Sequence, residues 1–297
     1  MQILITGGGG FIGAWLVRRL AGTGHQLRVL EPAKRGTEFE RIAGPAAGGV
    51  AWHLGDITDA SVVNAAAAGC DAIIHLAGIL TPACKADPVR GAMINLVGTL
   101  NVFSAARALR IRRIVYTSSA GVYGPDDEGE PLPITHYGAF KLACEGSARA
   151  CWEDDGLPSV GFRPYIVYGF GRETGLTAGP SLACRAAVRG EAYAIPYVGT
   201  AGLVFVDDVV AAYEAALLRE PDGPHVFNLP GQVASNADVV DAIRSVKPDA
   251  RIGIEGPALP FKEDIGEGDL RRVFPDLPST SLKDGIRRTI ELYAANK

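Results

Sequence analysis

The sequence has few of the features that mark secreted, membrane-bound or nucleic-acid-binding proteins. Its five cysteines are odd in number and form no C-x-x-C pair, which argues against a disulfide framework or a zinc site and favours a reducing, cytoplasmic setting. The five histidines show no metal-ligand spacing, so no metal is expected. The N-terminus lacks the features of a signal peptide, and no apolar run reaches membrane-spanning length. The net charge of −4 gives no electrostatic reason to expect nucleic acid or a membrane as a partner.

What the chain does have is a regular alternation of short apolar runs with longer helical patterns. The runs are QILIT at 2–6, QLRVLE at 26–31, VAWHLGD at 50–56, DAIIHLA at 71–77, RIVYTSS at 113–119 and SVGFRPYIVYG at 159–169. This alternation predicts an α/β fold, a Rossmann-like doubly wound parallel sheet with helices on both faces. We expect a first domain over 1–169 and a smaller, interleaved α/β region over 170–297, from which segments near 203–230 return to the sheet.

A glycine-rich loop follows the first predicted strand. In LITGGGGFIG, Gly7, Gly10 and Gly13 are spaced G-x-x-G-x-x-G between a strand and a helix, and Gly8, Gly10 and Gly13 also satisfy G-x-G-x-x-G. Glycines in this position let backbone N–H groups and a helix N-terminus approach a pyrophosphate. Glu31 ends the second predicted strand, where a carboxylate can bind the adenosine ribose hydroxyls of NAD and would repel the 2′-phosphate of NADP. NAD is therefore the expected cofactor, although the basic residues Lys34 and Arg35 follow closely and could accommodate the phosphate of NADP.

Tyr137 and Lys141 lie four residues apart in the helical pattern HYGAFKLACE, so they share one helix face. A tyrosine phenol ordinarily titrates near 10 and acts poorly as a base at neutral pH. Favouring its ionised form down to about pH 7 requires about 4 kcal/mol, which one cation at ~4 Å can roughly supply at an effective dielectric constant near 20. For this motif alone, a core tyrosine beside a surface lysine would be the preferred interpretation.

Taken together, the motifs resemble those of the extended short-chain dehydrogenases/reductases, in the NAD-dependent epimerase/dehydratase family. The stretches that carry the resemblance are TGGGGFIG at 6–13, GDIT at 55–58, HLAG at 75–78, NLVGTLN at 95–101, YTSSAGVYG at 116–124, YGAFK at 137–141 and FVDDVV at 205–210. They span most of the first 210 residues in the family's order. The resemblance implies an enzyme that binds NAD and a small carbohydrate-like molecule.

The resemblance also implies roles for single residues. Ser119 would position the substrate oxygen, Tyr137 would act as the base, and Lys141 would bind the nicotinamide ribose. Arg163 is a further candidate to bind substrate. Cofactor contacts are implied for Gly7, Gly10, Phe11, Ile12, Gly13, Glu31, Asp56, Ile57, Leu76, Ala77, Gly78 and Asn95. Family members are commonly homodimers joined through helices near 89–110 and 136–154.

Three departures from the family pattern bear on the substrate. Ala120 and Gly121 stand where family dehydratases carry acidic residues, which argues against dehydration. Ile166 and Leu203 replace an asparagine and an arginine that sugar-nucleotide enzymes commonly use to contact the diphosphate. Arg163, Arg172 and Arg185 are the remaining candidates for a phosphate. These departures favour a smaller or non-nucleotide substrate.

The sequence therefore predicts an NAD-dependent oxidoreductase or epimerase that abstracts hydride from a secondary hydroxyl of a sugar, sugar acid or sugar nucleotide. The motifs do not decide between an epimerase and a dehydrogenase. The alternative is a non-catalytic NAD(P)-binding sensor or assembly protein on the same fold.

Overall fold

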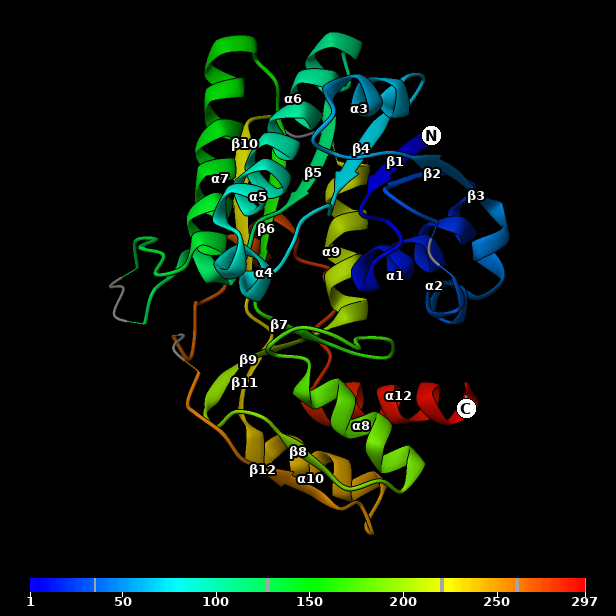
Figure 1. The fold of residues 1–297 in the computed structure, drawn as a ribbon, viewed down its shortest axis with the longest axis vertical. Coiled ribbons are helices and arrows are strands. Elements are labelled where there is room, and N and C mark those ends of the chain that lie inside the picture. Colours follow the sequence, from blue (N-terminus) through cyan, green and yellow to red (C-terminus); the bar gives the residue numbers. More distant parts are fainter. Residues whose placement is uncertain (35, 126–128, 220–221, 260–261, 297) are drawn as a thin grey trace.

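Seven parallel strands form the central sheet in the computed structural model, which describes residues 1–34, 36–125, 129–219, 222–259 and 262–296 (Figure 1). The strand order is β10-β6-β5-β4-β1-β2-β3. Their bounds are β1 Gln2–Thr6, β2 Gln26–Glu31, β3 Val50–Leu54, β4 Ala72–His75, β5 Arg113–Thr117, β6 Ser159–Pro164 and β10 Pro224–Leu229. The predicted doubly wound parallel sheet is confirmed.

Helices cover both faces of this sheet, as the continuous apolar strands require. Ile3 and Ile5 of β1 pack with the helices of one face, and Leu4 packs with those of the other, because successive side chains of a strand point in opposite directions. The first face carries α1 (Phe11–Leu20), α2 (Thr37–Ala43) and α9 (Val206–Leu218), and the second carries α3 (Ala60–Ala67), α6 (Gly98–Leu109) and α7 (His136–Asp155). Short 3-10 turns lie at 21–23 (η1), 44–49 (η2) and 120–122 (η4).

The strand order reverses between β1 and β4, so the segments that follow their carboxyl ends lead in opposite directions and leave a crevice at that edge of the sheet. Such a switch point is where open α/β sheets bind ligands. The smaller part of the molecule lies against this edge (Figure 1).

The smaller part contains two further sheets. One has the order β11-β9-β7, and the other pairs β12 with β8. The bounds are β7 Ile166–Tyr168, β8 Tyr193–Ile195, β9 Thr200–Phe205, β11 Gln232–Ser235, β12 Ile252–Ile254, α8 Gly179–Arg189, α10 Asn236–Val246, α11 Leu270–Val273 and α12 Leu282–Ala295. The run at 159–169 is therefore two strands, since β6 ends at Pro164 and β7 pairs with β9 instead.

The long helix that precedes β5 spans Pro88–Leu109, close to the range 89–110 indicated by the sequence. After α4 (Thr81–Ala86), α5 (Pro88–Ala92), a π-helical turn η3 (Met93–Val97) and α6 follow one another without a break. Contrary to the expectation from sequence, the stretch Pro88–Leu109 is long and apolar enough to cross a membrane by length and composition alone. That is weak evidence, because core helices pass the same test, and this helix packs against α3 and α7.

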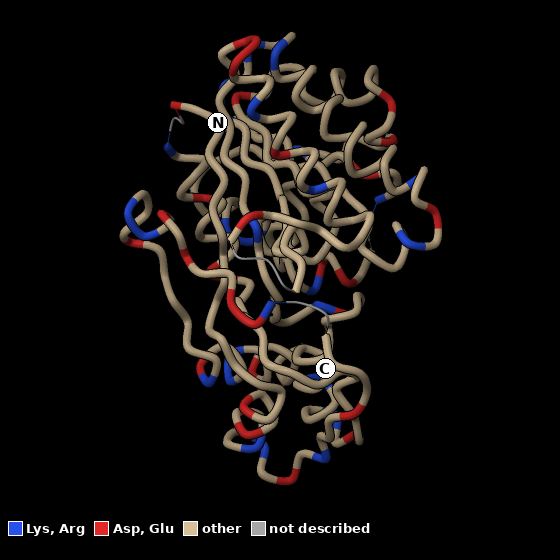
Figure 2. Tube along the Cα trace, turned by 90° about the vertical axis from the view of Figure 1, so that its left-hand side faces the viewer, with Lys and Arg blue, Asp and Glu red and all other residues tan. Residues whose placement is uncertain are grey.

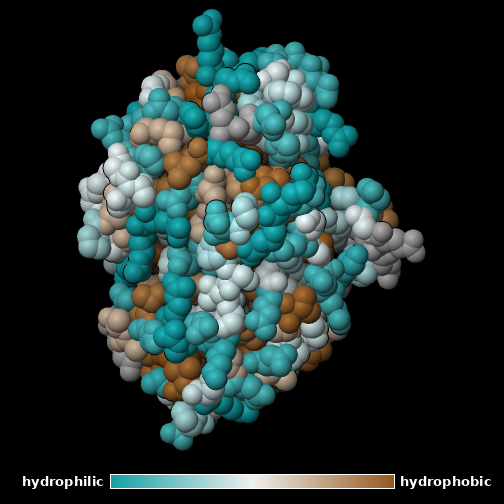
Figure 3. All heavy atoms as spheres, turned by 180° about the vertical axis from the view of Figure 1, so that it is seen from behind, coloured by the Kyte–Doolittle hydropathy of each residue, from teal (hydrophilic) through white to brown (hydrophobic). Residues whose placement is uncertain are grey.

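Charged residues of both signs alternate along the chain and over the molecule (Figure 2). On the face opposite that of Figure 1, apolar groups lie in small areas between hydrophilic ones (Figure 3). All five cysteines are free thiols.

Candidate active site

The glycine loop lies between β1 and α1 at the switch point of the sheet. Gly7 has φ +70°, and a Cβ there would lie 2.6 Å from the main-chain nitrogen of Ala77. A Cβ on Gly13 would lie 2.4 Å from the carbonyl oxygen of Gly8, so neither position accepts a side chain without moving backbone. Gly10 is the N-cap of α1 and provides no side-chain cap. Because the N–H groups at the start of a helix attract anions, this bare N-terminus suits the pyrophosphate of a dinucleotide.

The ends of β2 and β3 provide the expected positions for the adenosine half of that ligand. Glu31 is 6% exposed at the end of β2, and its Oε1 accepts the N–H of Gly9 at 2.9 Å. The carboxylate thus also braces the glycine loop. After β3, Asp56 is exposed and accepts the N–H of Thr58 at 2.9 Å, while Ile57 is buried against α3 and α6.

The loop after β4 approaches the glycine loop from the other side of the crevice. Leu76 and Ala77 are half-buried, and Gly78 is exposed. Beneath them Asn95 is 0% exposed; its Oδ1 accepts the N–H of Ile79 at 3.2 Å and its Nδ2 donates to the Ile79 carbonyl at 3.1 Å. The side chain of Asn95, which the resemblance implies as a cofactor contact, is therefore fully buried and bound to the loop, so its direct effect is on the position of that loop.

His75 lies at the end of β4 and is hydrogen-bonded on both sides of its ring. Its Nδ1 lies 2.6 Å from Thr6 Oγ1, and its Nε2 lies 2.9 Å from Thr99 Oγ1. Thr99 donates its own proton to the carbonyl of Asn95 at 2.6 Å, so it accepts from His75 Nε2–H. Burial, with the nearby charge of Lys141, lowers the pKa of His75 to about 3, and the neutral ring is retained.

Ser119 and Tyr137 are brought together by a close approach of α7 to the turn η4. A Cβ on Gly138 would lie 2.0 Å from the carbonyl oxygen of Gly121, so a glycine must follow Tyr137. An atom placed at the Cβ position of Gly121 would lie 3.2 Å from Ser119 Oγ and 3.6 Å from the ring of Tyr137. Two side chains 18 residues apart in sequence thus face one small volume.

Lys141 lies one turn after Tyr137 on the inner side of α7. The residue is 3% exposed, and its Nζ donates to the carbonyl oxygen of Thr117 at 2.7 Å. The Nζ lies 5.8 Å from the ring centroid of Tyr137. It is also 3.7 Å from the Cβ position of Gly78, which places the ammonium between the phenol and the loop after β4.

Arg163 does not line this pocket in the described part of the chain. Its Nη2 and Nε donate to the two carboxylate oxygens of Glu145 at 2.6 and 2.8 Å, and its Nη1 donates to Tyr123 Oη at 2.6 Å. Ser118 Oγ also donates to Glu145. Arg163 therefore supports the segment that carries Ser119 from behind, and the expectation that it contacts substrate is not met by this geometry.

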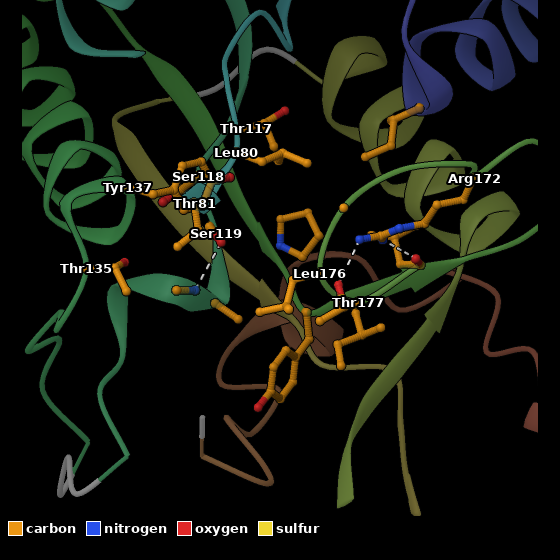
Figure 4. Close-up of a pocket in the computed structure, with 18 of the residues that line it drawn as sticks. Leu80, Thr81, Thr117, Ser118, Ser119, Thr135, Tyr137, Arg172, Leu176 and Thr177 are labelled. Carbon is orange, nitrogen blue, oxygen red and sulfur yellow. Dashed lines mark hydrogen bonds between the residues drawn. The ribbon is translucent and has the colours of Figure 1, made fainter. Parts of the chain in front are cut away.

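The pocket itself lies between the end of the sheet and the segment after β7 (Figure 4). Tyr137 and Ser119 form one side, while Arg172 and Thr177 lie across from them (Figure 4). Ile166 is part of its wall, whereas Leu203 is buried in β9, beside Ile166 in the register of the sheet. Leu80, Thr81, Thr135, Leu176 and Thr177 were not predicted, since their neighbours in sequence form no recognisable motif.

Comparison with known proteins agrees with the motifs. Residues 3–229 match the model of the NAD dependent epimerase/dehydratase family. A UDP-glucose 4-epimerase of Mycolicibacterium smegmatis is 30% identical, with 99% of this chain and 98% of that protein covered. A 3 beta-hydroxysteroid dehydrogenase/Delta 5-->4-isomerase of Mycobacterium tuberculosis is 34% identical, with 58% of this chain but only 49% of that protein covered.

Solved structures show the same relationship. The UDP-glucose 4-epimerase of Thermus thermophilus, crystallised in complex with NAD, has a TM-score of 0.83 at 25% identity, with 99% of each chain covered. The UDP-glucose 4-epimerase of Thermotoga maritima has a TM-score of 0.87 at 22% identity, with 100% of this chain and 99% of that chain covered. With its matching fold and motifs, this chain belongs to the NAD-dependent epimerase/dehydratase family and is an NAD-dependent enzyme of the extended short-chain dehydrogenase/reductase type.

Proposed function

We propose that the protein abstracts hydride from a secondary hydroxyl of a sugar, sugar acid or sugar nucleotide, with Tyr137 as the base. The observation that carries this proposal is the convergence of Tyr137 and Ser119 on one volume at the carboxyl edge of the sheet, with Lys141 beside them. Removing hydride from an alcohol also requires removing the hydroxyl proton, and this arrangement provides a group for that task.

The proposed roles follow from the hydrogen bonds of each group. Ser119 Oγ accepts the N–H of Gly121 at 3.0 Å, which leaves its own O–H to donate to the substrate oxygen. Tyr137 accepts the proton of the substrate hydroxyl. Lys141, fixed by the Thr117 carbonyl, places a positive charge near the ring of Tyr137. NAD, when bound, supplies the hydride acceptor.

The proposed cofactor contacts are those of the crevice. The N–H groups of the glycine loop at Gly7, Gly10 and Gly13, with Phe11 and Ile12, would hold the pyrophosphate. Glu31, Asp56 and Ile57 would meet the adenosine half. Leu76, Ala77 and Gly78 would flank the nicotinamide half, with Lys141 at its ribose. The uncapped start of α1 and the lack of room for side chains on the loop support this placement.

The same triad serves an epimerase, which returns the hydride to the other face, and a dehydrogenase, which does not. The relatives include both kinds of enzyme.

We propose that the first domain extends over 1–169 with the returning segments near 203–230, and that the remainder, 170–297, selects the substrate. A homodimer joined through α5–α6 and α7 stays a prediction.

The test is the variant Tyr137→Phe, which keeps the ring and removes the ionisable hydroxyl. We expect NAD to bind with unchanged affinity while turnover falls by about 100-fold or more, the range of general acid–base catalysis. NAD affinity is measured by calorimetry, and turnover by NADH formation and by NMR detection of stereochemical change across a panel of sugars, sugar acids and sugar nucleotides. Turnover equal to the wild type would remove Tyr137 from the mechanism.

A further inference from the structure

Arg172 is a half-buried cation without an ion-pair partner in the described part of the chain. Its Nη2 donates to Thr177 Oγ1 at 2.8 Å, and its Nη1 donates to the carbonyl oxygen of Val167. Both partners are neutral. Burial lowers the pKa of Arg172 to about 10, and the neighbouring phenols of Tyr197 and Tyr137 offset this only in part.

Four other arginines that the fold removes partly from solvent contact a carboxylate, whereas Arg28, also half-buried, donates to the main-chain carbonyls of Ala66 and Ala68. The pairs are Arg163 with Glu145, Arg185 with Glu173, Arg19 with Glu214 and Arg288 with Asp207. Desolvating a cation without a compensating anion is costly. Arg172 lines the pocket without such an anion, which indicates that an anionic ligand occupies the pocket during function.

The segment after β7 fixes the guanidinium at the pocket. Gly175 has φ +105°, a conformation that suits glycine, and its Cβ position lies 3.2 Å from Leu80 Cδ1 and 3.7 Å from Arg172 Nη2. This segment and the loop after β4 thus meet beside the pocket. The guanidinium points toward the middle of the pocket, across from Ser119 and Tyr137 (Figure 4). Two of its five N–H groups are used by the contacts to Val167 and Thr177, and the others can meet a ligand.

The lining of the pocket indicates which anion fits. Among the described residues that line it, Arg172 alone carries a charge. A diphosphate carries about two negative charges and is usually met by several charged donors. A carboxylate carries one, and its two oxygens match the fork of a guanidinium. Much of the remaining lining is apolar: Ile12, Leu80, Pro82, Ile166, Val167 and Leu176.

We propose that Arg172 binds the carboxylate of the substrate, so that the enzyme acts on a hydroxy acid: a secondary alcohol held at Ser119 and Tyr137, with a carboxylate at the opposite side of the pocket. The inference rests on the proposed function, which it narrows from carbohydrates in general to sugar acids and simpler hydroxy acids.

The experiment measures binding directly, so that it does not depend on turnover. NAD-saturated Tyr137→Phe protein is titrated by calorimetry with glucuronate, galacturonate, 3-hydroxybutyrate and 3-hydroxyoctanoate, each beside its neutral methyl ester. We expect at least one acid to bind tenfold or more tightly than its ester. Adding Arg172→Gln should abolish that preference while leaving ester binding and NAD affinity unchanged. Arg172→Lys should restore part of it, and Arg189→Gln, at the exposed end of α8, is the control that should change nothing.

Three results would overturn the proposal. In the first, no acid binds more tightly than its ester. In the second, glucose 1-phosphate or UDP-glucose binds more tightly than every acid. In the third, Arg172→Gln and Arg172→Lys weaken NAD but keep the preference for acids, which would assign the guanidinium to the cofactor's pyrophosphate. If acid binding depends on Arg172 but the wild type turns over none of the bound acids, the proposed function fails and the carboxylate site remains.

Discussion

Removing the carboxylate of Glu145 should destabilise the protein far more than removing an exposed charge. The side chains of Glu145 and Arg163 are 7% and 14% exposed, and two hydrogen bonds join them. Desolvation alone would lower the pKa of Arg163, but the hydrogen bonds and charge of Glu145, with Tyr123, raise it above its usual value. Glu145→Ala leaves this guanidinium buried without an anion and also deprives Ser118 of its acceptor.

The expected magnitude follows from the burial of the pair. Breaking a buried ion pair by deleting one partner costs about 3–5 kcal/mol, and the lost hydrogen bond of Ser118 adds about 1 kcal/mol. Glu145→Ala should lose both contributions in free energy of unfolding, whereas Arg163→Ala, which keeps the hydrogen bond from Ser118 to Glu145, should lose only the contribution of the broken ion pair, about 3–5 kcal/mol. The double variant should lose much less than the sum, because no unpaired charge is left.

The assay is urea unfolding of the four proteins in the double-mutant cycle, followed by far-UV circular dichroism. An exposed pair, Arg287 and Glu291 on α12, provides the control cycle and should show a coupling below about 1 kcal/mol. Additive losses for Glu145 and Arg163, or a loss below about 1 kcal/mol for Glu145→Ala, would refute the argument that this ion pair supports the segment bearing Ser119.

Three further predictions concern the crevice. Because the pKa of His75 is lowered to about 3, the unfolded chain binds a proton below about pH 6.5 that the native protein does not bind. The free energy of unfolding should therefore fall by about 1.4 kcal/mol per pH unit below that value. In unfolding experiments between pH 7 and pH 5, His75→Gln should lack this pH dependence. Gly13→Ala should weaken NAD binding at least tenfold, because its Cβ meets backbone, whereas Gly146→Ala, on the open face of α7, should leave calorimetric NAD affinity unchanged. Asn95→Leu should cost about 1–3 kcal/mol by leaving the Ile79 N–H unpaired and should raise the KM for NAD; an unchanged KM would show that the loop is held by other contacts.

Local sequence was sufficient for the parts of the site that one motif encodes. The glycine loop needs only a strand, residues without side chains and a helix start, all within about ten residues. Tyr137 and Lys141 share a face because both belong to one helix. The parallel sheet followed from alternating strands and helices, each of which is recognisable from its own apolar pattern.

Contacts between distant segments decided the rest. Arg163 lies near the end of a predicted strand, where a substrate-binding residue is expected. In the structure, however, Glu145 from α7 binds it behind the pocket. The run at 159–169 reads as one strand, but hydrogen bonds with β9 divert its second half into another sheet. Asn95 lies beneath the loop after β4, where its side chain binds the main chain of Ile79, and not at the surface of the cofactor crevice.

The sequence by itself determined the family, the sheet and the shared helix face of Tyr137 and Lys141, because short-range spacing fixes which face of a helix a residue occupies. The approach of Ser119 to Tyr137 depends on the close contact of α7 with η4. Only the tertiary structure decided which arginine faces the pocket. Arg163 and Arg172 are equivalent in sequence, each a cation in or after a strand, and they differ in whether a carboxylate from another element lies within reach. That difference depends on packing between segments that no local pattern records.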